Sequence, residues 1–257
     1  MPVREFVSSA NIVNTQLPPE LRTSLEKAKI LGLRWDPIKD CFLFNTPKFD
    51  FDQTFTRRVM LSFIAKLFDP LGFLCPALLE ARLLISEIWT HKELGWDDQV
   101  PQEIMLKWKF WAIDWNDGYE VKIPRFIRHY KAFVQLHVFS DASDQAMGVA
   151  AYLLTQDRTK PVSRGLNPSC HLIMAKSLVK PAKMPKSEET TPKLELHALM
   201  IAVKIAKYIS VELNLSAPKS VVLWTDSTIN ISRLKNGGRN LTGTFLKNLK
   251  KYGALGR

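Results

Sequence analysis

The stretch FVQLHVFSDASDQAMGVAAYLL, residues 133–154, contains the pattern that decides the fold. Val134, Leu136 and Val138 alternate with their neighbours at the period of a β-strand, and residues 147–154 form a second apolar run. The polar segment 142–146 between the two runs predicts a turn. The stretch therefore predicts a β-hairpin whose first strand ends at Asp141.

The residues that follow continue this pattern. A third strand is expected over residues 171–179, a long helix over 193–213, a short apolar strand over 221–225, and a further helix from about residue 226. The order β-β-β-α-β-α predicts an α/β domain with a mixed sheet and packed helices. We place its boundary near residue 130, so that residues 131–257 form one domain.

Residues 1–130 predict a mainly helical segment. Two short strands at 29–35 and 41–44 flank a turn, and three helices are expected over 55–68, 76–92 and 101–115. In the last of these helices Ile104, Trp108, Trp111 and Trp115 fall on one face. Such a stripe could contact nucleic acid, but large apolar side chains at helical spacing usually pack, and we expect packing here.

The positive charge of the chain is concentrated in its second half. The 257 residues have a net charge of +11, and residues 133–257, with 18 Lys and Arg against 8 Asp and Glu, account for +10 of it. Residues 158–186 and all residues after Asp226 contain cations and no acid. Such a field attracts polyanions, so nucleic acid is the expected partner. A basic surface that serves only solubility is the alternative.

Composition also bears on the cellular compartment. No apolar run approaches the roughly 20 residues of a membrane helix, and the first ten residues, MPVREFVSSA, have no apolar signal core. The three cysteines are widely spaced and odd in number, which indicates reduced thiols. We therefore expect an intracellular protein, cytoplasmic or nuclear, that is neither secreted nor bound to a membrane. The oligomeric state stays open.

Two carboxylates are expected at the ends of strands, Asp141 in Phe139-Ser140-Asp141 and Asp226 in Trp224-Thr225-Asp226. Aspartate is common in turns and at helix N-caps, so either residue could be purely structural. Asp226 in particular could cap the helix that follows it.

Glu195 is placed less ordinarily. At about 100° per residue it falls on the helix face of Leu199, Ala202, Ala206 and Ile209, opposite Lys193, His197, Lys204 and Lys207. Burying an unpaired carboxylate is costly, so Glu195 should lie near the rim, be protonated, be paired with a cation, or favour the helix dipole. One hypothesis accounts for Asp141, Glu195 and Asp226 together: they converge and share divalent metal. Oxygen-only ligands suit Mg²⁺ or Mn²⁺, which would support phosphodiester cleavage.

Three segments in this order, FSDASDQAMGVAAYL (139–153), KLELHAL (193–199) and VVLWTDST (221–228), resemble the first three acidic motifs of a retroelement-type ribonuclease H domain. Upstream, KILGLRW (29–35), LSFIAKLFDPLGFLCP (61–76) and GWDDQVP (95–101) resemble the segment that follows the polymerase core in BEL/Pao-class retrotransposon polyproteins.

The resemblance implies a ribonuclease H-like fold and metal-dependent cleavage of RNA in RNA–DNA hybrids. It assigns catalytic and metal-binding roles to Asp141, Glu195 and Asp226. Residues 1–130 would be a reverse transcriptase thumb- or connection-like segment without the polymerase palm, and the remainder of the retroelement polyprotein would be a partner. The residues expected to contact the nucleic acid are Ser143, Ser227, Lys176, Arg233 and Lys235.

Two alternatives accompany this interpretation. No Asp or Glu follows Asp226, so the family's fourth acid has no counterpart. Residues 131–257 are therefore expected to form a C-terminally incomplete domain, and a nucleic-acid-binding remnant without catalysis is the first alternative. The second is an aspartic peptidase, because the family is often named Pao retrotransposon peptidase. Asp226-Ser227-Thr228 lacks the glycine of the Asp-Ser/Thr-Gly loop that such peptidases need.

Overall fold

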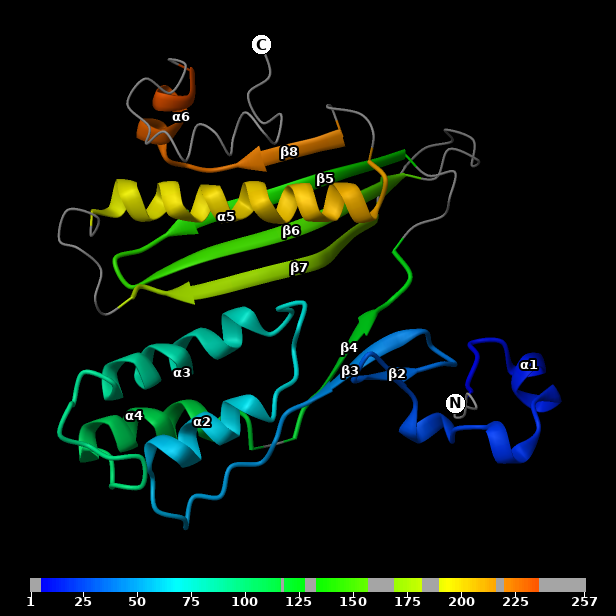
Figure 1. Cartoon of the computed structure of the whole chain (residues 1–257), viewed down its shortest axis with the longest axis horizontal. Helices are drawn as coiled ribbons and strands as arrows, with labels where there is room; N and C mark the ends of the chain where they lie inside the picture. The colour runs from blue at the N-terminus through cyan, green and yellow to red at the C-terminus, as the bar shows by residue number, and fades with distance from the viewer. Residues whose placement is uncertain are drawn as a thin grey trace. The chain divides into compact units, whose positions relative to one another are not determined.

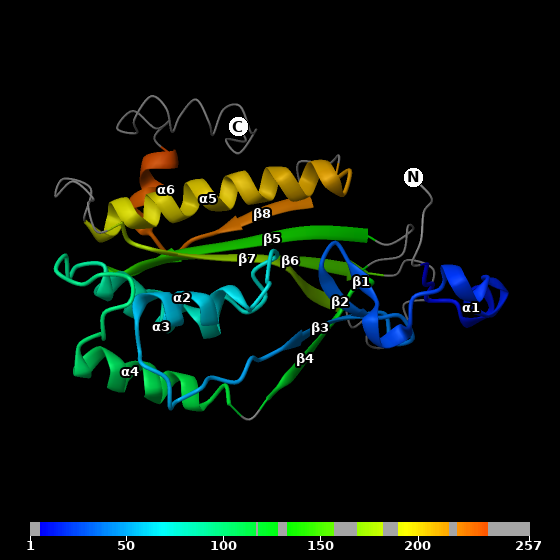
Figure 2. The ribbon, with the colours of Figure 1, turned by 60° about the horizontal axis from the view of Figure 1, so that its bottom comes forward.

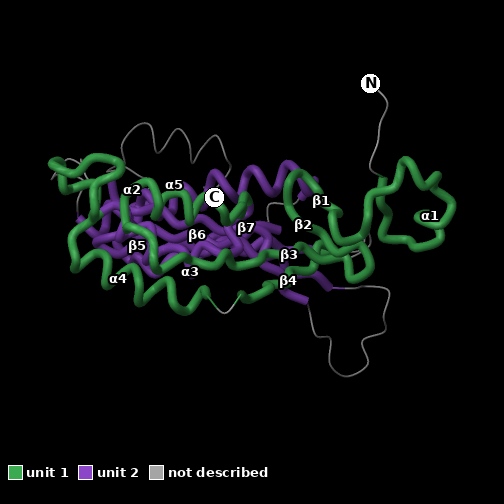
Figure 3. Tube along the Cα trace, turned by 90° about the horizontal axis from the view of Figure 1, so that it is seen from below, with its two compact units in different colours: residues 1–70, 87–127 green, residues 71–86, 128–257 purple. Residues whose placement is uncertain are grey.

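A computed structural model describes residues 6–116, 118–127, 133–156, 169–181, 190–215 and 220–235. Figure 1 and Figure 2 show the described helices and strands from two directions. The chain forms two compact units, drawn in green and purple in Figure 3. The first comprises residues 1–70 and 87–127, and the second comprises residues 71–86 and 128–257. Residues 71–86, which the sequence placed in the helical segment, thus fold with the second unit.

The first unit contains an antiparallel sheet in the order β1-β2-β3-β4. Its strands are β1 (Lys29–Ile30), β2 (Leu33–Asp36), β3 (Cys41–Asn45) and β4 (Glu120–Pro124). The strand expected over 29–35 is divided, because Leu31 and Gly32 adopt positive φ values of 49° and 88° and turn the chain back on itself. β4 was not predicted, since its residues are almost all exposed and show no apolar alternation.

Helices make up most of the rest of this unit: α1 (Asn11–Gln16), α2 (Arg57–Ala65) and α4 (Gln102–Ile113), with 3-10 turns at Pro19–Leu21 and Leu25–Lys27. Thr56 caps α2, because its Oγ1 accepts a hydrogen bond of 3.2 Å from the amide of Val59. The stripe of Ile104, Trp108, Trp111 and Trp115 is buried, which confirms that it packs. None of the helices that the structure describes is both long and apolar enough to span a membrane.

The second unit is built on a mixed sheet, as the sequence predicted, and its strands lie in the order β7-β6-β5-β8. The strands are β5 (Phe133–Ala142), β6 (Ala146–Gln156), β7 (Ser169–Val179) and β8 (Val221–Trp224). The first three pair antiparallel, and β8 pairs parallel to β5, from Leu136↔Val221 to Phe139↔Trp224. β5, which contains Asp141 near its end, and β8, which ends two residues before Asp226, are therefore parallel neighbours.

Helix α5 (Thr191–Glu212) covers one face of this sheet, and α6 (Thr228–Lys235) follows β8 (Figure 2). Ala142, Met147 and Leu178 of the sheet pack against Leu194 and Ala198 of α5. Because strand residues alternate between faces, Asp141, Gly148 and Ser177 point to the other face.

Helix α3 (Cys75–Ile88) contributes its residues up to Ser86 to the second unit, where it lies beside β7 on the face that α5 leaves open. Arg82 Nη1 donates a 2.8 Å hydrogen bond to Ser177 Oγ, and Ser177 Oγ donates to the carbonyl oxygen of Cys75. The turn before α3 is equally close, because the amide of Ala175 donates to the carbonyl oxygen of Leu71 over 2.8 Å.

Gly72, in the Phe-Asp-Pro-Leu-Gly motif, is required by this contact. Its φ is +77°, and a Cβ placed on it would lie 1.9 Å from the carbonyl oxygen of Ala175. Only glycine combines that conformation with so close an approach of two backbones. The motif that marks the upstream segment therefore has a structural purpose, which is to bring α3 to the edge strand β7.

Candidate functional site

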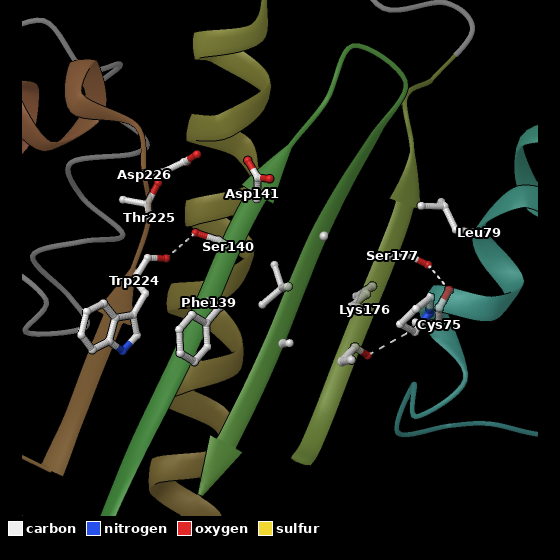
Figure 4. A pocket seen from close by; sticks show the side chains of 15 residues that line it. Cys75, Leu79, Phe139, Ser140, Asp141, Lys176, Ser177, Trp224, Thr225 and Asp226 are labelled. Carbon is white, nitrogen blue, oxygen red and sulfur yellow. Dashed lines mark hydrogen bonds between the residues drawn. The ribbon is translucent and has the colours of Figure 1, made fainter. Parts of the chain in front are cut away.

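A groove with a volume of about 620 Å³ lies on the face of the sheet that α5 does not cover. We call it the carboxylate groove. All the residues that line it belong to the second unit. They include Pro76 and Leu79 of α3 and, from the sheet and the residues that follow it, Phe139, Asp141, Gly148, Lys176, Trp224 and Asp226. Figure 4 shows the groove from close by.

The parallel register of β5 and β8 brings Asp141 and Asp226 together. Phe139 and Trp224 are register partners, and each aspartate follows its aromatic residue by two positions. Both carboxylates are exposed and line the groove, and Figure 4 shows them at the same end of it. Two side chains 85 positions apart in the sequence thus meet because their strands end side by side.

The local hydrogen bonds around Asp141 and Asp226 do not explain why two carboxylates lie in the same groove. Asp141 Oδ1 accepts a hydrogen bond from the following amide, of Ala142, over 2.7 Å. The N-cap of α6 is Ser227, whose Oγ accepts from the amide of Asn230, so Asp226 does not cap this helix. Within the described part of the chain neither carboxylate has an ion-pair partner. Two like charges in one groove repel each other unless a cation joins them.

Glu195 lies in the first turn of α5, next to the buried Leu194, and is half-buried. The predicted packing face of the helix is confirmed, because Leu199, Ala202, Ala206 and Ile209 are buried. Glu195 is not among the residues that line the carboxylate groove, and its side chain makes no hydrogen bond or ion pair with a described residue. Among the described residues, no three acidic, histidine or cysteine side chains are arranged to hold a metal ion.

A buried asparagine that was not predicted from the sequence connects the first turn of α5 to α6. Asn230 of α6 has no exposed surface, and its Nδ2 donates to the carbonyl oxygen of Pro192 over 3.0 Å and to Ser227 Oγ over 2.8 Å. Pro192 is in the first turn of α5, three residues before Glu195, and Asn230 is four residues after Asp226. Asn230 therefore fixes the first turn of α5 against the start of α6. A polar residue between the apolar neighbours Ile229 and Ile231 was the available signal.

The residues expected to contact nucleic acid lie in different surroundings. Ser143 is exposed and organises the β5–β6 turn, since its Oγ accepts from the amides of Gln145 and Ala146. Ser227 is buried, and a contact through its hydroxyl would compete with the cap of α6. Lys176 is exposed and is one of the residues that line the carboxylate groove.

The other two expected contacts are on α6. Arg233 is half-buried and donates from Nη1 to Asn230 Oδ1 over 3.4 Å, and Lys235 is exposed at the last position of the helix. Most of the basic stretches lie outside the described residues, namely Arg158, Lys160, Arg164, Lys183, Lys186 and every cation after Lys235.

The aromatic side of the groove was also missed. Phe139 and Trp224 are 43% and 47% exposed, their ring planes differ by only 7°, and their centroids are 5.7 Å apart. The sequence did contain a signal, because an aromatic residue precedes each of the two aspartates by two positions.

Comparison with known proteins places the chain among retroelement proteins. The family model described as Pao retrotransposon-like RNaseH-like domain matches residues 56–227. A solved structure of the foamy viral protease-reverse transcriptase dRH in complex with double-stranded DNA is similar to the chain at 16% identity and a TM-score of 0.41. The match covers 77% of this chain and 30% of that one, so the chain spans less than a third of the viral protein. No curated protein matches the chain.

Proposed function

The chain belongs to the family of Pao retrotransposon-like RNaseH-like domains, and from this premise we propose that its second unit is a metal-dependent nuclease. The proposed reaction is hydrolysis of the RNA strand in RNA–DNA hybrids. One observation carries the proposal: Asp141 and Asp226, at the ends of two parallel neighbouring strands, line the same groove without a cationic partner among the described residues.

The donor chemistry of these residues fits a hard divalent cation. Both side chains offer only oxygen, both are exposed to the groove, and their mutual repulsion would be relieved by Mg²⁺ or Mn²⁺. We propose that Asp141 and Asp226 hold the ion and that Glu195, from the first turn of α5, is the third carboxylate. Such a metal, when bound, supplies a water of lowered pKa and neutralises charge on the phosphate.

Other residues of the unit would fix the positions of the carboxylates and attract the substrate. Asn230 sets the first turn of α5 against α6, so that Glu195 and Asp226 keep a fixed backbone separation. The net charge of +10 over residues 133–257 would concentrate nucleic acid near the groove.

The test is cleavage of a labelled RNA–DNA hybrid by the full chain in Mg²⁺ or Mn²⁺. Asp141→Asn, Glu195→Gln and Asp226→Asn should each reduce cleavage to background. Asp144→Asn is the matched control, because it removes the same charge from an exposed position of the β5–β6 turn that does not line the groove. If the wild-type chain cleaves and all four variants cleave as fast, the assignment of the three carboxylates is wrong.

A second candidate is a nucleic-acid-binding unit without catalysis. It is favoured by the finding that no three potential ligands among the described residues are arranged to hold a metal. This candidate predicts that the hybrid binds with an affinity that falls steeply with salt, and that neither metal produces cleavage or heat of binding in calorimetry. Cleavage that requires Asp141 would exclude it.

A further inference from the structure

We propose that the carboxylate groove binds unpaired nucleobases of single-stranded nucleic acid, which stack on Phe139 and Trp224. The proposal rests on the proposed function only in taking nucleic acid as the partner. It adds a site for unpaired bases that neither the paired hybrid nor the metal requires.

The two rings form a flat aromatic surface that is open to the groove. Their planes are within 7° of each other, and Figure 4 shows the faces of both rings turned toward the viewer, side by side. Almost half of each residue is exposed, although the sheet offers a buried face to large apolar side chains. Aromatic faces of this kind bind bases without regard to sequence, because every base has a π-face.

The rings are also held in place before any ligand arrives. The indole nitrogen of Trp224 can only donate, so it donates to Nδ1 of His137 over their 3.0 Å separation. The ring of Tyr152 meets Phe139 edge to face, with 5.8 Å between centroids and an angle of 85°. Because these contacts fix both orientations, a base that stacks here loses little affinity to ordering the protein.

The space beside the rings suits a planar ligand. Between them and Pro76 and Leu79 of α3, the groove has small residues such as Gly148 and Ala150. A Cβ placed on Gly148 would meet no atom within 4 Å, so this space is not filled by the protein itself. The volume of about 620 Å³ is in the usual range for small-molecule sites, and most of the lining is apolar.

Charge favours nucleic acid over an apolar protein segment as the occupant. The half of the chain that contains the groove has a net charge of +10, which attracts a phosphate backbone. The charged residues that line the groove are two aspartates and one lysine, Lys176, so its net charge is negative. Phosphates should therefore stay outside it while a neutral base enters. The aromatic pair lies two strand residues, or about 6.6 Å, from the aspartates, so the base would sit next to the proposed cleavage centre.

The test compares a labelled oligo(dT) with an abasic oligonucleotide of the same length and charge, by fluorescence anisotropy with the full chain in EDTA. We expect the wild-type protein to bind oligo(dT) more tightly. Trp224→Ala should weaken the binding of oligo(dT) by about 5- to 150-fold and leave the binding of the abasic strand unchanged. Trp224→Phe should retain most of the preference. Tyr208→Ala is the matched control, since Tyr208 is 56% exposed on α5 and should not matter.

A second variant tests the groove without touching the rings. Gly148→Leu places a side chain into the open space and should abolish the preference for bases while leaving the abasic strand bound. Equal binding of both oligonucleotides by the wild-type protein would overturn the proposal. Concentration-dependent self-association that Trp224→Ala abolishes, without any base preference, would assign the surface to a protein partner and overturn it as well. Because this binding assay contains EDTA, its result does not depend on catalysis. A base preference in the wild-type chain, together with no cleavage of the hybrid in Mg²⁺ or Mn²⁺, would refute only the proposed nuclease.

Discussion

Replacing Gly72 by alanine tests whether direct backbone contact between the turn before α3 and strand β7 holds α3 in the second unit. A Cβ at this position would lie 1.9 Å from the carbonyl oxygen of Ala175 and 2.9 Å from Cys75 Sγ. Ordinary van der Waals contact begins at about 3.4 Å, so the turn and β7 would have to separate by about 1.5 Å. That displacement breaks the 2.8 Å hydrogen bond from the amide of Ala175 to Leu71.

The expected cost is the sum of two effects. Alanine at a φ of +77° costs about 1 kcal/mol more than glycine, and loss of a partly buried hydrogen bond costs about 1–3 kcal/mol. We expect the free energy of local opening between α3 and β7 to fall by about 2–4 kcal/mol, which increases the exchange rate of the affected amides at least 30-fold.

Hydrogen exchange followed by mass spectrometry on the full chain measures this effect where it occurs. Peptides that contain β7 and the first turns of α3 should exchange faster in Gly72→Ala, and peptides from the first unit should not change. Gly148→Ala is the matched control, because its Cβ enters open space and its strand should be as stable or slightly more stable. If Gly72→Ala exchanges in β7 like Gly148→Ala, the proposed contact between the turn and β7 is wrong.

Three further predictions concern single side chains. Asn230→Ala should lower the free energy of unfolding by about 2–3 kcal/mol in urea titrations, because it empties a fully buried position and removes a hydrogen bond to the partly buried carbonyl of Pro192. An unchanged midpoint would contradict this. Arg57 is buried and donates to three backbone carbonyls, so Arg57→Met should lower the unfolding free energy of the first unit by about 3 kcal/mol. Arg58→Met should have a much smaller effect, because Arg58 is exposed. Equal effects of the two substitutions would contradict this prediction. Burial raises the pKa of Asp40, but hydrogen bonds from Arg125 and Trp35 outweigh it and leave this pKa below its usual value. The stabilisation that Asp40 provides is therefore complete above the usual aspartate pKa, and it is lost as pH falls through the lower pKa of the folded state. The difference in unfolding free energy between the wild-type chain and Asp40→Asn should therefore shrink on acidification. A difference that stays constant with pH would refute this.

Most of the secondary structure was predictable because apolar periodicity reports burial. β5, β6, α4 and α5 each bury one regular set of side chains, and their positions agree with the sequence to within a few residues. β4 has no such pattern, since its residues are exposed and the strand is held by backbone pairing with β3 alone. Nothing local in the chain encodes a strand of that kind.

The site was predictable only as far as local motifs reach. Aspartates at two strand ends could be identified, but their meeting depends on the parallel pairing of β5 and β8, which local periodicity does not specify. The helical pattern placed Glu195 on the packing face of α5, yet position on a face does not determine which groove a side chain lines. Asn230 and Gly72 act through partners 38 and about 100 residues away, so their roles became visible only in the folded chain.

The register of β5 and β8 explains why aromatic and acidic residues occur in pairs at the groove. Phe139-Ser140-Asp141 and Trp224-Thr225-Asp226 repeat the order aromatic, polar, acid, and the strands pair Phe139 with Trp224. Because alternate residues share a face, this single pairing aligns the two rings and, two residues later, the two carboxylates. A slip of one residue in β8 would move its ring and its acid to the α5 face at once. The stacking surface and the carboxylate pair therefore both depend on the register of β8. A variant that shifts this register should lose base-dependent binding and cleavage together.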